Sequence, residues 1–288
     1  MILIADSGST KTDWRLVDET KITQFRTAGL NPYHLSGEEI ATIVHDGFKD
    51  EAHVNKVKDV FFYGAGCANK EKSNVVAEAL RHTFVNTTIH VENDLLAAAH
   101  ALCGREPGIV AILGTGSNSC LYDGSKITAQ VPSLGYLLGD EGSGVHIGKK
   151  FLQCFLYNEL PADLIKAISE KHPITLDEVL DNIYKKPQAN KYISSFSTII
   201  HKHINHPFLI KLVYDCFEEF FSHHVSKYYN PAVETQNFAS LQLHAVGSIA
   251  YFYSHIFKAV AADKGISVGR ILQTPIAGLT LYHVGEKS

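Results

Sequence analysis

Two apolar stretches of this chain each end in a turn of glycine and hydroxyl residues, and this pairing constrains the fold more than any other feature. The apolar residues 2–5 precede DSGSTKT at residues 6–12, and the apolar residues 108–113 precede GTGSN at residues 114–118. Each run has the length of a buried β-strand, and a further extended run follows each turn. The sequence therefore predicts two hairpins, one opening each half of the chain.

The remaining segments extend these hairpins into a duplicated α/β architecture. Setting Gly8 on Gly116 places Ile4 on Ile112, so both halves open with a strand, a polar turn and a second strand. Further strands are predicted at residues 22–27, 57–63, 88–91, 241–246 and about 270–273. Helices are predicted from a capping box at Ser36 and Glu39, at about 70–84, at 94–102, through 144–230, after 248 to about 262, and from 275.

Composition excludes several classes of protein. Hydrophobic residues make up 45% of the 288 residues, and the net charge is −4, which excludes intrinsic disorder and argues against a dedicated nucleic-acid binder. No apolar run is long enough to span a membrane, and the first residues lack the basic region of a signal peptide, so a cytoplasmic protein is expected. The five cysteines form no C-x-x-C pair, so neither a disulfide framework nor a structural zinc is expected. Metal chelation is likewise not expected at the histidine pairs His201/His203 and His223/His224.

The turn at residues 6–12 has the chemistry of a phosphate site. Small residues let backbone N–H groups approach an anion, the hydroxyls add donors, and Asp6 at the strand end can hold Mg²⁺ through water. The spacing is not that of a P-loop, and a plain hairpin explains this turn alone equally well. A second such turn, in the equivalent place of the other half, favours a grip on a polyphosphate.

Carboxylates follow two other predicted elements. Asp94 comes after the strand at 88–91, where the ligand crevice of an α/β sheet lies, and is a candidate general base toward a substrate hydroxyl. The alternative is that Asn93 or Asp94 caps the next helix. In GYLLGDEGSG at residues 135–144, glycines bracket two acids, and Asp140 fits recognition of sugar hydroxyls. The alternative there is a loop before a helix whose first turn favours acids.

These segments together resemble the actin-like ATPase superfamily of sugar kinases, actin and heat-shock chaperones. More narrowly, the chain resembles the N-acetylglucosamine kinases, in the group that also holds ATPase activators of radical acyl-CoA dehydratases. The resemblance rests on residues 6–10, 29–32 (GLNP), 92–94 (END), 114–118, 139–143 (GDEGS) and 246–248 (VGS), in the family's order over most of the chain. It implies an α/β fold of two ribonuclease-H-like lobes with a nucleotide cleft between them.

The resemblance also implies a role for each segment. The phosphates of ATP would bind Ser7, Gly8, Ser9, Thr10, Lys11, Gly114, Thr115 and Gly116, and the adenosine would lie against Gly247 and Ser248. The sugar would be bound by Asn31, Gly66, Asp94, Ser117, Asn118, Gly135 and Asp140. Asp94 would be the catalytic base on the sugar 6-hydroxyl, and Asp6 would hold Mg²⁺ through water. Many superfamily members carry Gly-Gly where this chain has Gly247 and Ser248, which leaves the nucleotide preference open.

The sequence therefore predicts an ATP-dependent kinase of an N-acetylated amino sugar, with N-acetylglucosamine and its 6-phosphate as the expected substrate and product. The expected domains are an N-terminal lobe at 1–107, on which a helix at about 275–288 packs, and a C-terminal lobe at 108–274 with a helical insert at about 150–230. Besides ATP and Mg²⁺, the expected partner is the small sugar, with no nucleic acid and no membrane. A homodimer is an expectation from the family alone.

Two other functions fit the same fold. A dehydratase activator carries an iron–sulfur cluster, and the absence of closely spaced cysteines argues against it. A non-catalytic sugar sensor is the second alternative. Regulators of that kind often add a DNA-binding helix-turn-helix, for which the chain is expected to leave no room before Asp6.

Overall fold

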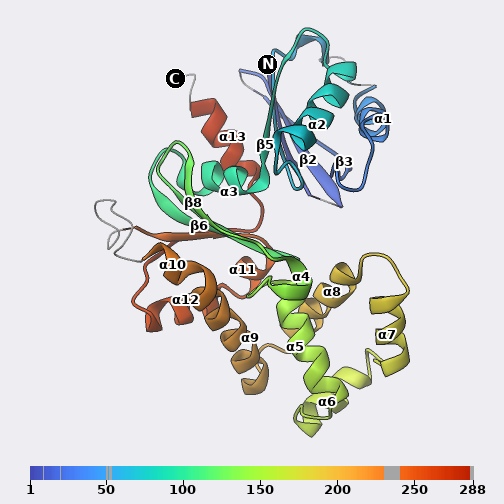
Figure 1. The fold of residues 1–288 in the computed structure, drawn as a ribbon, viewed down its shortest axis with the longest axis vertical. Coiled ribbons are helices and arrows are strands. Elements are labelled where there is room, and N and C mark those ends of the chain that lie inside the picture. Colours follow the sequence, from blue (N-terminus) through green and yellow to red (C-terminus); the bar gives the residue numbers. More distant parts are fainter. Residues whose placement is uncertain (9, 20, 50, 52–53, 230–240, 286–288) are drawn as a thin grey trace. The chain divides into compact units, whose positions relative to one another are not determined.

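The computed structural model describes residues 1–8, 10–19, 21–49, 51, 54–229 and 241–285. The chain divides into two compact units, one made of Met1–Arg105 with Pro275–Ser288 and the other of Glu106–Thr274. Each unit is built on one five-stranded sheet flanked by helices (Figure 1).

The sheet of the first unit has the strand order β3-β2-β1-β4-β5. Its strands are β1 (Ile2–Ser7), β2 (Lys11–Val17), β3 (Ile22–Ala28), β4 (Asp59–Gly64) and β5 (Thr88–Asn93). The first three form an antiparallel meander, whereas β4 and β5 run parallel to β1. All five predicted strands are confirmed, and the carboxyl ends of β1, β4 and β5 meet at one edge.

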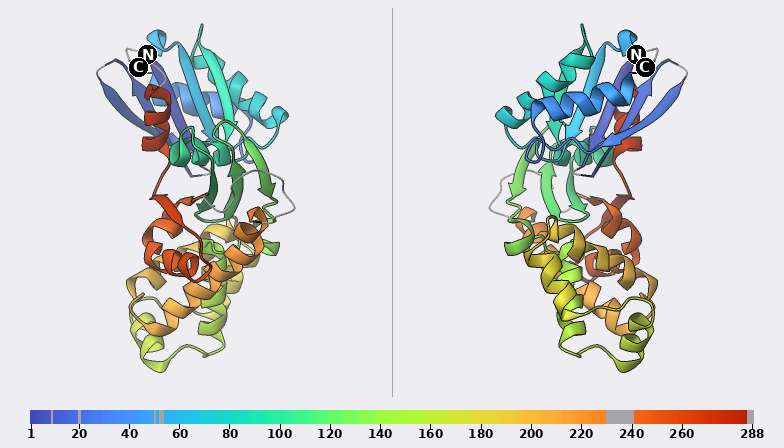
Figure 2. Two further views of the ribbon diagram at one scale, coloured as in Figure 1. Left: turned by 90° about the vertical axis from the view of Figure 1, so that its left-hand side faces the viewer. Right: turned by 90° about the vertical axis from the view of Figure 1, so that its right-hand side faces the viewer.

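Helices cover both faces of this sheet. They are α1 (Gly37–Phe48), the 3-10 turn η1 (Val54–Lys56), α2 (Lys70–Thr83), α3 (Asp94–Cys103) and α13 (Ile276–Val284). The predicted capping box is confirmed, because Ser36 and Glu39 exchange side-chain to backbone hydrogen bonds at the start of α1. Helices α1 and α2 lie side by side in Figure 1. Helix α13 packs on α3, β1 and β2, and Figure 2 shows it in dark red beside the blue strands of the sheet. Its Leu279 packs with Ile2 and Ile4.

The sheet of the second unit repeats the first, with the order β8-β7-β6-β9-β10. Its strands are β6 (Gly108–Leu113), β7 (Ser117–Tyr122), β8 (Ile127–Val131), β9 (Leu243–Val246) and β10 (Val268–Leu272). Aligning the strand bounds sets Gly8 level with Gly114, two residues from the predicted partner Gly116. The sequence pattern could not separate these registers, because a shift of two residues keeps every side chain on the same face of a strand.

Strand β8 was missed by the sequence analysis. It is an edge strand whose side chains alternate between half-buried and exposed, so it lacks the apolar run of a central strand. The predicted helix that ends near residue 262 is also corrected, because it is interrupted at Tyr253 between α11 (Ser248–Phe252) and α12 (Ser254–Asp263).

The middle of the chain is helical as predicted. Its helices are α4 (Gly135–Leu138), α5 (Gly144–Leu156), α6 (Ala162–Ser169), α7 (Leu176–Tyr184), α8 (Ala189–Lys202), α9 (Pro207–Phe220), the π-helical segment η2 (Phe221–Val225) and α10 (Ser226–Tyr228). Two glycines allow α5 and α8 to pack closely, since a Cβ atom on Gly148 would lie 2.1 Å from the Ile193 carbonyl oxygen and one on Gly144 2.3 Å from Ser194 Oγ. Among the described residues, no helix combines the length and the apolar character that a membrane crossing requires.

Candidate active site

The first polar turn joins β1 to β2 and is closed by the Gly8 N–H, which donates to the Lys11 carbonyl oxygen over 3.0 Å. Gly8 is not demanded by packing within the described residues, where an added Cβ would meet only the Lys11 carbonyl oxygen, at 3.8 Å, apart from its chain neighbours. A glycine there leaves the backbone open to close approach by an anion. Thr10 is exposed in this turn, and Ser9 lies outside the described residues.

Ser7 holds the turn rather than facing outward. Thr12 Oγ1 donates to the Ala28 carbonyl oxygen, so the Ser7 hydroxyl donates to Thr12 Oγ1 (2.8 Å) and accepts from the Leu30 N–H (3.1 Å). The side chain is buried, and both hydrogen bonds are made to other residues of the protein rather than to solvent. Its hydroxyl therefore ties the turn to the loop that carries Asn31.

Asn31 is buried beside Gly66. Its Oδ1 accepts the Tyr33 N–H at 2.9 Å, which fixes the loop, and a Cβ atom on Gly66 would lie 2.4 Å from the same oxygen. Gly66 also has φ +88°, a conformation that favours glycine. The structure thus brings these two predicted sugar-binding residues into contact.

Three carboxylates lie near one another in the first unit. Asp6 faces Asp13 across the β1–β2 pair. Burial, followed by the negative charges of Asp13 and Asp94, raises the pKa of Asp6 to about 7. Burial also opposes the charge on Asp13, but hydrogen bonds from Lys11 Nζ (2.7 Å) and Arg26 Nε (2.8 Å) outweigh it and lower the pKa of that carboxyl. Lys11, a predicted phosphate ligand, is thus paired with Asp13.

Asp94 is the first residue of α3, directly after β5. The capping interpretation is confirmed for Asn93, whose Oδ1 accepts the Leu96 N–H at 2.8 Å. The role of Asp94 as a base stays a prediction. Burial raises the pKa of Asp94 to about 6, against the opposing effect of its own N–H and the Leu95 N–H. Such a carboxyl can accept a proton near neutral pH, which is what a general base requires.

The second polar turn joins β6 to β7 in the other unit. The first backbone groups of α5 fasten it, since the Gly144 N–H donates to the Gly114 carbonyl oxygen (2.8 Å) and the Val145 N–H to that of Thr115 (3.0 Å). In the part of the chain that the structure describes, a Cβ on Gly114 would meet no atom within 4 Å apart from its chain neighbours. Like Gly8, Gly114 is therefore not required by packing within the protein.

Asp140 is buried against this turn. It has φ +60°, and its Oδ1 accepts the Ser117 N–H at 3.2 Å. A Cβ atom on Gly116 would lie 2.8 Å from Oδ2, so only glycine leaves room for the carboxyl there. Burial raises the pKa of Asp140. The buried Ser117 hydroxyl has no hydrogen-bond partner among the residues that the structure describes, which is unusual for a buried polar group and is expected where a ligand binds.

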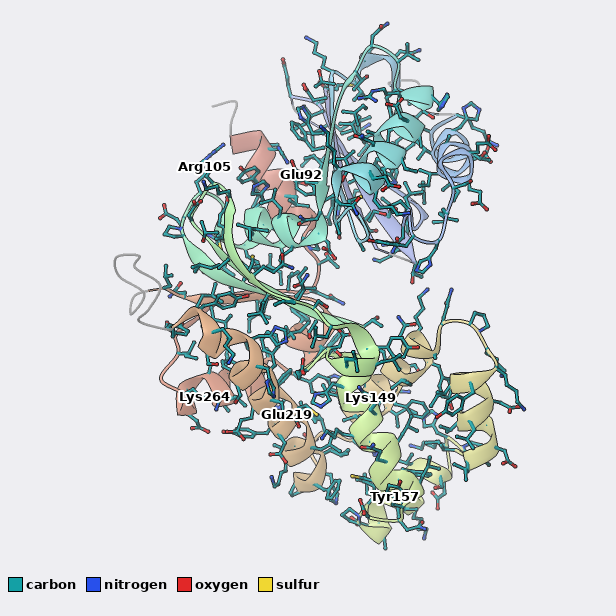
Figure 3. All side chains as sticks on the ribbon, in the orientation of Figure 1. Glu92, Arg105, Lys149, Tyr157, Glu219 and Lys264 are labelled. Atoms are coloured by element: carbon teal, nitrogen blue, oxygen red, sulfur yellow. The ribbon has the colours of Figure 1, made fainter. Side chains whose placement is uncertain are left out.

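Two other predicted sugar-binding residues of this unit, Asn118 and Gly135, lie in different local structures. Asn118 Oδ1 accepts from the Ser119 N–H (2.9 Å) and from Gln130 Nε2 (3.1 Å). Gly135, with φ +72°, starts the short helix α4 ahead of Asp140. The Tyr136 carbonyl oxygen in α4 accepts from Nζ of Lys149, which Figure 3 labels on α5.

Gly247 lies directly beside the second turn. Parallel pairing of β6 with β9 sets Ile112 opposite Val246, and a Cβ on Gly247 would lie 2.2 Å from the Leu113 carbonyl oxygen. Its φ of +122° also favours glycine. Two segments that the sequence assigned to the nucleotide, 114–116 and 247–248, are thus adjacent.

Sequence reasoning missed the polar residues behind Asp140. Buried His224 lies 3.2 Å from Glu141 and from Ser119, while His223 next to it is exposed. Neither histidine showed a metal-ligand spacing, and no local pattern could pair residue 224 with residue 119. Within the described ranges, no cluster of three metal-ligating side chains is present.

The two sheets have the same strand order, and each begins with a hairpin that has a polar turn. Each sheet also carries candidate functional residues at the ends of its strands. These features define a protein of the actin-like ATPase fold. A solved structure from Porphyromonas gingivalis, provisionally named an N-acetylglucosamine kinase, is 38% identical over the full length of both chains, with a TM-score of 0.91. The chain belongs to the N-acetylglucosamine kinase family of sugar kinases. No protein-family model matches the chain.

Two further proteins are similar to this chain, one in sequence and one in fold. The N-acetyl-D-glucosamine kinase of Dictyostelium discoideum is 28% identical over 211 residues, which are 65% of this chain and 65% of that protein's length. A ROK family glucokinase from Streptomyces griseus, solved with glucose and AMPPNP, is 14% identical, covers all of this chain and 99% of its own, and has a TM-score of 0.55. At that identity the glucokinase supports the fold alone.

Proposed function

We propose that this chain transfers the γ-phosphoryl group of ATP to the 6-hydroxyl of an N-acetylated amino sugar, with N-acetylglucosamine as the first substrate to test. The observation that carries the proposal is Asp94, a carboxyl at the end of β5 whose pKa is raised by burial to about 6 and whose neighbour Asn93 performs the capping. The names of the relatives from P. gingivalis and D. discoideum supply the sugar class.

The proposal gives each unit a share of the work. Backbone groups at Gly8 and Gly114 receive the phosphates, because neither glycine is needed to pack the protein itself. Asn31 and Asp140 hold sugar hydroxyls or the acetamido group, and Gly247 lines the adenosine site. Asp94 orients the 6-hydroxyl and takes its proton as the phosphoryl group arrives.

Magnesium fits the first unit. The negative charges of Asp13 and Asp94 oppose ionisation of Asp6, and a divalent cation near Asp6 would relieve that repulsion. Because no three ligating side chains converge within the described residues, the ion would keep most of its waters and bind ATP oxygens directly. Its chemical contribution would be to neutralise the developing phosphate charge.

A cytoplasmic location and a homodimer belong to the same proposal. None of the five cysteines, all of which lie in the described residues, forms a disulfide, and this fits a reducing compartment where ATP is available. Sedimentation of the purified protein measures the oligomeric state.

The test is ADP release from Mg-ATP with and without a panel of amino sugars. We expect stimulation by one N-acetylated sugar and a loss of about 10²–10⁴ in turnover in Asp94→Asn with sugar binding retained. The matched control is Asp46→Asn, an exposed carboxyl on α1. ADP release indifferent to every sugar would reject the kinase proposal. If iron were also found in the protein, the dehydratase activator would replace it, and sugar binding without turnover would favour the sensor.

A further inference from the structure

Two buried histidines bracket the loop at residues 139–143, which carries Asp140. His224 comes from the π-helical segment η2, and His146 comes from α5. Each is less than a tenth exposed, and each lies within hydrogen-bond distance of that loop. The two histidines therefore connect the loop to two helices of the second unit.

The hydrogen bonds around His224 have one consistent direction. The Val131 N–H can only donate, so Tyr228 OH accepts it (3.0 Å) and gives its own proton to Ser119 Oγ (2.9 Å). The Ser119 hydroxyl then donates to His224 Nδ1 (3.2 Å), which leaves the proton of the neutral ring on Nε2. That N–H donates to Glu141 Oε2 (3.2 Å), the residue after Asp140.

His146 follows the same logic on the other side of the loop. Its Nδ1 accepts the Gly142 N–H at 3.1 Å, so its ring proton also lies on Nε2. Nε2 lies 3.3 Å from Glu219 Oε2, and Glu219, labelled on α9 in Figure 3, also pairs with Lys150. Both rings thus accept at Nδ1 and donate to a glutamate at Nε2.

The π-helical segment η2 positions His224 to join this series of hydrogen bonds. A π turn shifts the residues after it around the helix axis, and such turns inside α-helices are frequent at functional sites. Here the shift coincides with a ring stacked on Phe220 (centroids 5.0 Å apart) and directed at both β7 and Glu141. A plain continuation of α9 would present a different face to the loop.

We propose that His224 is a positioning residue for the sugar site: through Glu141 it holds Asp140 in place on the Ser117 N–H, so that the carboxylate can accept a hydrogen bond from a substrate hydroxyl. His146 supports the same loop at Gly142. The inference rests on the proposed function, since the sugar is the ligand that Asp140 would read. A positioning role of this kind acts on sugar binding and leaves the phosphate turns unaffected.

The experiment compares three variants in the kinase assay. His224→Phe keeps the ring on Phe220 and removes both hydrogen bonds, His224→Gln restores a donor toward Glu141, and His223→Phe makes the same change at the exposed neighbour. For His224→Phe we expect the sugar KM to rise about tenfold or more, because a hydrogen bond to a charged group is lost, with kcat and the ATP KM changed less than about twofold. His224→Gln recovers most of the KM, and His223→Phe matches the wild type.

Hydrogen exchange of residues 139–143 provides a readout that does not need activity. We expect exchange there to be about tenfold faster in His224→Phe than in His223→Phe. The exchange rates of the β7 amides should be the same in both variants. The inference is overturned if exchange in His224→Phe is unchanged, or if exchange is faster but the sugar KM is unaffected. It is also overturned if kcat falls and the KM values for sugar and ATP rise by similar factors. If the wild type itself ignores every sugar, the proposed function fails, and the exchange experiment still decides whether His224 holds the loop.

Discussion

At the scale of single residues, the proposed base gives the chain a defined pH dependence. Burial raises the pKa of Asp94 to about 6, and only the ionised carboxylate can accept the sugar proton. We therefore expect kcat/KM for the sugar to fall by about tenfold per pH unit below about pH 6 and to level off above it. The measurement is the pH profile at fixed ionic strength, and a flat profile between pH 5 and 8 would contradict the role of Asp94.

Ionisation of Asp6 is expected to lower the stability of the folded protein, although the proposed magnesium site needs this carboxylate. The folded protein keeps a proton on Asp6 up to about pH 7, whereas the unfolded chain releases it near 3.8. Stability therefore falls as the pH rises between these values. Asp6→Asn removes this loss, so its Tm should exceed that of the wild type by about 2–4 °C at pH 8, and should not exceed it at pH 4. Thermal unfolding at both pH values checks the sign, and a lower Tm at pH 8 would be inconsistent with it.

The glycines of the two turns separate ligand binding from folding. Among the described residues, a Cβ atom at Gly8 or Gly114 meets no close neighbour, so Gly8→Ala and Gly114→Ala should leave Tm within about 2 °C of the wild type. Each methyl would nevertheless occupy the space that phosphate oxygens need, and the ATP KM should rise by about tenfold. Steady-state kinetics with varied Mg-ATP measure this, and an unchanged KM would remove that turn from the phosphate site.

At the scale of elements, apolar runs predicted the central strands, because strands covered on both faces need continuous hydrophobic sequence. The edge strand β8 has no such run and was not predicted. Turn chemistry placed the candidate residues near strand ends, as the structure has them. The hydrogen bonds of Ser7 with Leu30 and of His224 with Ser119 could not be assigned from sequence, because they join residues 23 and 105 positions apart. The roles of the site residues in binding and catalysis stay predictions.

The crossing of α5 and α8 links a helix interface to the second turn. Gly148→Ala would bring a methyl onto the Ile193 carbonyl group, and backbone cannot move aside as a side chain can. We expect a loss of about 1–3 kcal/mol in the free energy of unfolding, and a higher ATP KM because α5 fastens the Gly114 turn. Urea unfolding measures the loss. Gly285→Ala, whose added Cβ would have no atom of the described residues within 4 Å beyond its chain neighbours, is the control that should behave as wild type.

At the scale of the whole molecule, the chain returns to its first unit at its end. Helix α13 follows the second unit in sequence but packs with Ile2, Ile4 and Ala97 of the first. The two units have separate hydrophobic cores, since the large core of residues 109–261 shares no member with those of the first unit. A substitution in α13 can therefore change the stability of the first unit, although most of that unit lies far from α13 in the sequence.

Leu279 and Leu281 in α13 make a matched pair for testing this arrangement. Leu279 is fully buried and Leu281 is 76% exposed, so Leu279→Ala should cost about 2–4 kcal/mol and Leu281→Ala less than about 0.5 kcal/mol. The single tryptophan, Trp14, is buried in the first unit, so its fluorescence reports that unit, whereas far-ultraviolet circular dichroism is dominated by the helices of the second. In Leu279→Ala the fluorescence transition should move to lower temperature while the main dichroism transition stays in place. If both transitions move together, the two units unfold as one cooperative structure, and α13 stabilises the entire chain rather than the first unit alone.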